Sequence, residues 1–288
     1  MSYNYDKLTS QYLAWVERQT GGRANYLPKE ADDIPKALVT AASEGDCRGM
    51  AQNLSYLGNW YARHGVVEIS RGNAGGWTEL SLAALDMFWR IRIKCRSYDR
   101  TENKIKASNF APSILDAGKC GILCFSLNGW AEAGWMGRRL EQSREDESLT
   151  PWTWKHAVPR LVIALHRYLE GNKNLSDLEL GAYEDIFGHW EDSDGLKKAL
   201  LQAADYHAAN LKDKGNDIAE FSGAPIDIMP AELVSIQRVR EKLGLETPAI
   251  DHPLMKTPLA NPPRDLKFTP DDLLTKVIDK VGTIIPDL

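Results

Sequence analysis

Apolar residues recur every three or four positions along most of the chain, which is the spacing that places them on one face of an α-helix. In the first half this pattern predicts helices that start near Tyr5, Asp33, Asp46 and Trp77, and glycines such as Gly21, Gly45 and Gly65 end the first three. A largely apolar stretch from 112 to 135 predicts a central buried helix, interrupted near Gly129.

The second half continues in the same manner. Helix starts are predicted at Thr150, Ser176, Ser193, Pro230 and Thr269, and the first of these helices either kinks or begins at Pro159. The only strand-like run is 66–69, and the five prolines between 248 and 267 predict an extended segment before the last helix. We therefore expect an all-α fold of about ten helices, in an irregular, solenoid-like array of helix pairs.

An acidic stretch from Glu141 to Ser148 is typical of a loop and is the predicted boundary between two helical halves, 1–140 and 150–288. With 288 residues the chain can bury a core of its own. We expect the two halves to form one compact unit.

Composition narrows the class of protein. The net charge of −5 argues against a general nucleic-acid binder, which needs a basic excess. The N-terminus lacks the pattern of a secretory signal, and no apolar run reaches the length of a membrane span, so we expect a cytoplasmic protein without a membrane partner. Four cysteines are too few for a disulfide scaffold, and Cys120 with Cys124 indicates either two buried residues or half of a metal site.

The common catalytic motifs are missing. The sequence contains no GxxxxGK[ST], GxGxxG or GxSxG pattern. Residues 72–76 are rich in glycine and form either an anion cradle or a plain loop before a helix. His189, Glu191, Asp192 and Asp194 form either a metal site or an acidic loop between two helices. We predict no catalytic residue, no cofactor and no metal.

Charge is distributed unevenly. Residues 90–106 hold seven basic and two acidic residues, which is typical of a helix end passing into a basic loop, whereas residues 170–227 hold thirteen acidic and five basic ones, a net charge of −8. Such a surface, with exposed aromatics from Tyr183, Phe187 and Trp190, favours a basic protein partner, although a solvated polar face gives the same pattern. The predicted partner-binding residues are Glu184, Asp185, Trp190, Glu191, Asp192 and Asp194.

The C-terminal third carries a family resemblance. The string Ile226–Leu233, the Leu-Gly-Leu at 243–245 and the Asp-His-Pro-Leu at 251–254 resemble the closing region of all-α immunity proteins from bacterial polymorphic-toxin and type VI secretion systems. The connections at 42–46 and 75–77 are similar to those between helix pairs in such proteins.

This resemblance implies a cytoplasmic inhibitor, not an enzyme, that binds a cognate toxin and occludes its active site. An acidic inhibitor suits a basic toxin, and nucleases are often basic because their substrate is acidic. Two alternatives stay open. One is a helical enzyme with an unrecognised site, with or without a metal, in which His156, His166, His189 or His207 serves as an acid or base, and the other is a helical-repeat scaffold that binds a peptide. These patterns do not specify the oligomeric state.

Overall fold

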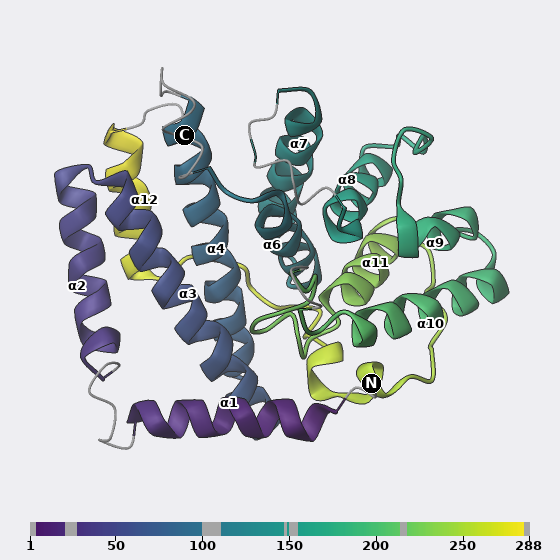
Figure 1. The fold of residues 1–288 in the computed structure, drawn as a ribbon, viewed down its shortest axis with the longest axis horizontal. Helices are drawn as coiled ribbons and strands as arrows, with labels where there is room; N and C mark the ends of the chain where they lie inside the picture. Colours follow the sequence, from purple (N-terminus) through teal and green to yellow (C-terminus); the bar gives the residue numbers. More distant parts are fainter. Residues whose placement is uncertain are drawn as a thin grey trace. The chain divides into compact units, whose positions relative to one another are not determined.

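The structure is a computed structural model that describes residues 4–20, 28–99, 111–146, 149, 155–213 and 218–284. These residues form eleven α-helices and three short 3-10 helices, with no strand among them (Figure 1). The predicted all-α class is confirmed. The chain divides into two compact units, one of 1–6, 113–147 and 151–266 and another of 7–112, 148–150 and 267–288. These boundaries differ from the expected halves in two ways: residues 113–140 belong to the unit of 151–266, and the last helix belongs to the unit of the first ones.

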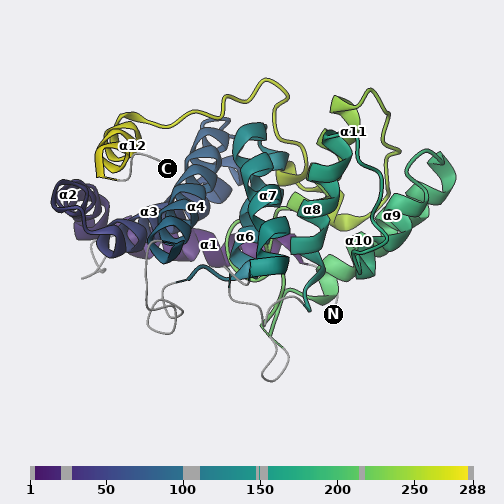
Figure 2. The same ribbon diagram turned by 90° about the horizontal axis from the view of Figure 1, so that it is seen from above.

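The second unit, here called the outer unit, contains α1 (Tyr5–Thr20), α2 (Pro28–Glu44), α3 (Cys47–Ser70), α4 (Gly76–Asp99) and α12 (Asp272–Ile284). The long helices α3 and α4 pack side by side, and α12 lies beside α2 (Figures 1 and 2). Apolar stripes meet in one core, to which α12 contributes Leu274, Val277 and Val281. Asp271 fixes the start of α12, since its Oδ1 accepts from the Leu274 N–H at 2.7 Å and its Oδ2 accepts from the Tyr61 hydroxyl at 3.3 Å.

Several predicted helix ends in this unit are wrong. Helix α2 begins at Pro28 and includes Pro35. Helix α4 ends at Asp99, inside the run 90–106 that was expected to hold a helix end and a basic loop, and residues 100–106 lie outside the described residues. Helix α3 passes through Gly65 and takes in the strand-like run 66–69. The reason at Gly65 is a close helix crossing: a Cβ there would lie 2.8 Å from the Gly76 carbonyl oxygen of α4. This glycine serves packing and does not end the helix.

Asp86 of α4 is the most deeply buried acidic side chain of the outer unit's described core. Its Oδ2 has no hydrogen-bond partner among the described residues, and its Cβ lies against Gly58 of α3. Burial, with a smaller contribution from Asp271, raises the pKa of Asp86 well above its ordinary value of 3.8. Asp86 is therefore a neutral acid in the folded chain under conditions where the unfolded chain ionises it.

Substituting Asp86→Asn should stabilise the outer unit increasingly as pH rises above about 4. Above that pH the folded wild-type chain keeps a proton that the unfolded chain has lost, so wild-type stability falls with rising pH, and the amide removes this dependence. Urea denaturation of both proteins at pH 4 and at pH 7 measures the difference in free energy of unfolding between Asp86→Asn and wild type. A stability difference between variant and wild type that does not change between the two pH values would contradict the assignment.

The first unit, here called the inner unit, is built around α6 (Ile114–Ser126), which α7 (Trp130–Asp146), α8 (Ala157–Leu169) and α11 (Ala231–Lys242) surround. Every side of α6 is covered, and every residue from Ile114 to Ser126 except Asp116 is buried. Glycines permit the close approach of α8, because a Cβ at Gly118 would lie 2.9 Å from Pro159 and one at Gly121 would lie 2.6 Å from Val162. The expected central buried helix is thus confirmed.

The predicted interruption near Gly129 is also confirmed. Asn128 adopts a left-handed conformation with φ 67°, and its side-chain amide donates to the carbonyls of Arg264 and Leu266 at 3.0 and 3.3 Å. Helix α7 then runs to Asp146, so most of the stretch expected to be a loop from Glu141 is helical, whereas 147 and 148 lie outside the described residues.

The remaining elements of the inner unit are η2 (Gly181–Tyr183), α9 (Glu184–Gly188), α10 (Ser193–Ala209), η3 (Pro253–Lys256) and η4 (Pro258–Ala260). The helix expected directly after Ser176 is absent, and regular structure resumes only at η2. The proline-rich segment is irregular as expected, with two short turns. Arg238 of α11 holds it by donating to the carbonyls of Pro262 and Pro263 at 2.6 and 3.0 Å.

Candidate functional site

The acidic residues predicted to bind a partner lie at the starts of α9 and α10. Glu184 and Asp185 are exposed in the first turn of α9, and Asp194 is exposed in the first turn of α10. Glu191 and Asp192 are exposed on the connection between these helices. The structure thus brings five predicted carboxylates to one short, exposed stretch, here called the acidic surface.

Two of the five carboxylates have local partners. Glu191 accepts from Lys173 at 2.7 Å, and this hydrogen bond lowers the pKa of Glu191. Asp192 is the N-cap of α10, where it accepts from the backbone N–H groups of Asp194 and Gly195, and the Gly195 bond lowers its pKa. The side chains of Glu184, Asp185 and Asp194 make no hydrogen bond or ion pair within the described part of the chain. These three are the carboxylates left for a partner.

The expectation of exposed aromatics is wrong. Tyr183, Phe187 and Trp190 are all buried. Trp190 stacks on Phe187 at 5.2 Å and contacts Tyr168 at 4.7 Å. The Arg240 guanidinium lies 5.0 Å from the Trp190 ring centre and donates to the Trp190 carbonyl. The buried Trp190 side chain therefore anchors the connection between α9 and α10, which bears part of the acidic surface. Trp190 itself is not accessible to a partner.

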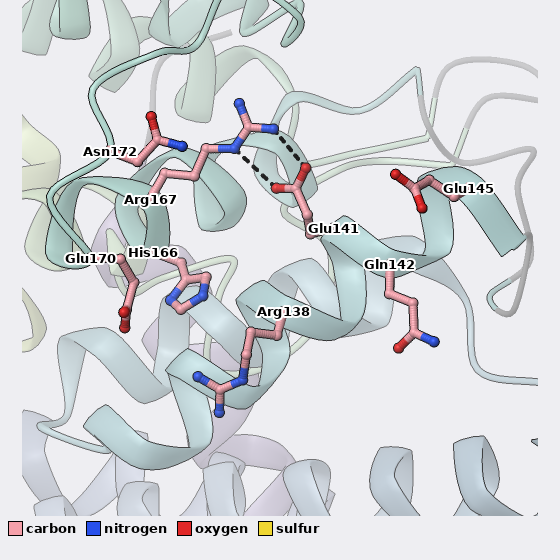
Figure 3. A pocket seen from close by; sticks show the side chains of 8 residues that line it. All are labelled: Arg138, Glu141, Gln142, Glu145, His166, Arg167, Glu170 and Asn172. Carbon is pink, nitrogen blue, oxygen red and sulfur yellow. Dashed lines mark hydrogen bonds and ion pairs between the residues drawn. The ribbon is translucent and has the colours of Figure 1, made fainter.

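A cavity of about 460 Å³, open to the surface and lined by charged and polar residues, lies between α7 and α8 (Figure 3). A charged network forms one wall. Arg167 donates to Glu141 at 2.6 and 3.1 Å and to Asp177 at 2.6 and 2.8 Å, and Arg144 donates to Asp177 at 2.7 Å. The two arginines hold the pKa of Asp177 well below its usual range. Bidentate geometry of this kind fixes the planes of the groups it joins.

His166 is the buried member of the cavity lining. A Cβ at Gly137 of α7 would lie 2.5 Å from the His166 Cβ, so the glycine permits this close crossing of α7 and α8. Burial, assisted by the charge of Arg138 and opposed by that of Glu170, lowers the pKa of His166. The imidazole is therefore neutral at pH 7.

A third polar group surrounds the buried Glu220 carboxylate. The Glu220 carboxylate accepts hydrogen bonds from the Val158 N–H at 2.5 Å and from the Tyr206 hydroxyl, and His156 Nδ1 lies 3.8 Å from it. A small cavity of about 270 Å³ adjoins it. Because each carboxylate oxygen already has a donor, this arrangement ties the start of α8 to α10 and gives Glu220 a structural role.

The histidines named as candidate acids or bases are dispersed. His189 contacts Asp192 at 3.1 Å on the surface, whereas His207 pairs with Glu232 at 2.8 Å in the interior. Cys120 and Cys124 are both buried on α6, with sulfurs 3.9 Å apart. Among the described residues no group of three or more His, Cys, Asp or Glu side chains is placed to hold a metal ion.

Sequence reasoning missed the cavity between α7 and α8. The charges of Glu141 and Arg144 were assigned to a loop, although their spacing of three residues is that of helix neighbours. Recognising a helix there would have placed Arg138, Glu141 and Glu145 on one stripe, and that stripe is the signal that could have found the wall.

Comparison of the chain with protein-family models, with curated protein sequences and with solved structures finds no match. In the part of the chain that the structure describes, no helix combines the length and the apolar character needed to cross a bilayer.

Proposed function

We propose that this protein is an inhibitor of the immunity-protein type, which binds a basic toxin domain in the cytoplasm and occludes its active site. The observation that carries the proposal is the acidic surface, where Glu184, Asp185 and Asp194 are exposed and without partners. Three carboxylates left unpaired within eleven residues create a local field that steers a positively charged partner.

The support beneath this surface favours a rigid docking site. Asp192 caps α10, and Trp190 is packed between Tyr168, Phe187 and Arg240. A surface held in this way loses little conformational entropy on binding. A basic nuclease is the toxin class that fits the charge best, because a nuclease must attract a polyanionic substrate.

The test begins with affinity purification of the tagged chain from its native cells, which should recover a basic protein in one-to-one ratio. The triple variant Glu184→Gln, Asp185→Asn and Asp194→Asn should then slow association with that protein about tenfold or more at low salt, with less effect at high salt. Asp192 and Glu191 are left intact because one caps a helix and the other pairs with Lys173.

A matched control removes three charges elsewhere. Asp33→Asn, Glu44→Gln and Asp279→Asn alter exposed carboxylates of the outer unit and give the same net charge as the test variant. Association rates measured by stopped-flow fluorescence should be close to wild type for this control. Equal slowing in both triple variants would assign the effect to net charge and refute the proposed interface.

A further inference from the structure

The cavity between α7 and α8 contains polar groups that the fold does not use. Its lining includes Arg138, Gln142 and Glu145 from α7 and Glu170 at the end of α8, and all four side chains are exposed at the mouth of the cavity. None of these side chains makes a hydrogen bond or ion pair within the described residues. Charged side chains gathered around a cavity without internal partners are available to an occupant.

His166 gives the cavity a fixed, buried polar group. The residue is only 9% exposed and its ring has no hydrogen-bond partner among the described residues, but its ring nitrogens are not among the fully buried atoms without a partner, so they open onto the cavity that the residue lines. Figure 3 shows the ring between Glu170 and Arg138. In its neutral form one ring nitrogen donates and the other accepts, so His166 can receive a hydrogen bond from an ammonium group.

The charged network beside the cavity stiffens its wall and offers no free charge to an occupant. Arg167 is fully engaged by Glu141 and Asp177, so it stiffens the wall and leaves its charge balanced. The charges that face an occupant are therefore Glu170, Arg138 and Glu145. In Figure 3, Glu170 lies beside His166 at one side, Glu145 lies at the far side, and Arg138 lies between them.

We propose that this cavity binds a free basic amino acid, such as lysine or arginine. The charge order of the lining, negative at Glu170, positive at Arg138 and negative at Glu145, is complementary to an α-ammonium group, a carboxylate and a cationic side chain. Gln142 places an amide beside the cationic side chain of the bound amino acid, and His166 accepts a hydrogen bond from its α-ammonium group. The volume of about 460 Å³ falls within the range of small-molecule sites.

Helix geometry agrees with the length of such a ligand. Arg138 and Glu145 are seven residues apart on α7, which separates their backbones by about 10 Å along the helix axis. This separation is comparable to the distance between the carboxylate and the terminal cation of an extended basic amino acid. A lysine residue inside a polypeptide lacks both the free ammonium and the free carboxylate, so the three charges together specify the free molecule. This site is distinct from the acidic surface and does not depend on the proposed inhibition of a toxin.

The experiment compares four probes that differ by one charged group each. Lysine carries all three charges, cadaverine lacks the carboxylate, norleucine lacks the side-chain ammonium and 6-aminohexanoate lacks the α-ammonium. Titrations of the full chain, followed by saturation-transfer difference NMR, should show lysine binding about tenfold more tightly than each of the others.

Variants then assign each charge to a residue. Arg138→Ala should lower the affinity for lysine about tenfold without lowering that for cadaverine, because cadaverine has no carboxylate to lose. Glu145→Gln should remove the preference for lysine over norleucine, because norleucine lacks the side-chain ammonium. Glu170→Gln should remove the preference for lysine over 6-aminohexanoate, because 6-aminohexanoate lacks the α-ammonium group. Since the cadaverine affinity of Arg138→Ala reports an intact cavity, misfolding is distinguished from loss of the contact.

Matched controls lie on exposed side chains outside the cavity. Arg264→Ala and Glu179→Gln remove one charge of each sign from residues that are 80% and 96% exposed, and they should leave all four affinities unchanged. Absence of lysine binding at about 10 mM, or equal affinities of the wild-type protein for all four probes, would overturn the proposal.

Discussion

Replacing Glu232 by alanine should lower the free energy of unfolding of the inner unit by about 3–5 kcal/mol. Glu232 lies in the first turn of α11 and pairs through Oε1 with His207 Nδ1 at 2.8 Å. Both side chains are completely buried, and Phe221 stacks on the imidazole at 4.2 Å. Removing the carboxylate leaves a buried polar ring without its partner, which costs more than the bond itself contributes.

The pair is incompletely satisfied even in the native structure. His207 Nε2 and Glu232 Oε2 are buried without partners in the described chain. An apolar pair of similar shape removes these two unsatisfied atoms along with the hydrogen bond between the two side chains. The double variant His207→Leu with Glu232→Met should therefore be more stable than His207→Leu alone and more stable than Glu232→Met alone.

Chemical denaturation of the two single variants and the double variant completes a thermodynamic cycle. The expected coupling free energy exceeds about 2 kcal/mol, because each single change strands the other group. Strictly additive effects would show that His207 and Glu232 contribute independently and would refute the pair as a unit.

The sequence predicts a helix well where the segment itself contains the start signal and the apolar stripe. Helix α10 shows this most clearly: Asp192 caps it, Leu196 and Leu200 form its buried stripe, and the segment needs no distant residue to be recognised. The interruption before α7 is local in the same sense, since the apolar run meets Asn128 and Gly129.

The sequence fails where a residue's role depends on distant partners. Pro35 and Gly65 resemble helix boundaries, but both lie inside helices that tertiary packing sustains. Trp190 resembles an exposed aromatic among acids, and its burial depends on Arg240, fifty positions later in the chain. No local pattern contains that information.

The same reasoning separates the two candidate surfaces. The acidic surface was predictable because its charged residues are neighbours in sequence. Trp190, which was predicted to belong to it, is buried in the structure. The cavity between α7 and α8 combines Arg138 with Glu170 across two helices, and only the crossing at Gly137 and His166 brings them together. Periodicity places each residue on a helix face but does not show which faces meet.

Close helix crossings also make a strong prediction for the outer unit. Substituting Gly65→Ala should lower its free energy of unfolding by about 2–3 kcal/mol, although alanine is the better helix former. A Cβ at this position would lie 2.8 Å from the Gly76 carbonyl oxygen and 3.0 Å from Leu80 Cδ2. The nearest atom belongs to the backbone of α4, so relief of the clash requires the two helices to separate along their interface.

Gly282 provides the matched control, since it also lies inside a helix of the outer unit and its added Cβ would meet no atom within 4 Å. Gly282→Ala should raise the free energy of unfolding by about 0.5–1 kcal/mol through helix propensity alone. Urea denaturation followed by circular dichroism measures both variants. Opposite signs for the same substitution would isolate the crossing of α3 and α4 as the cause, whereas stabilisation by Gly65→Ala would show that α3 and α4 do not approach as closely as the structure indicates.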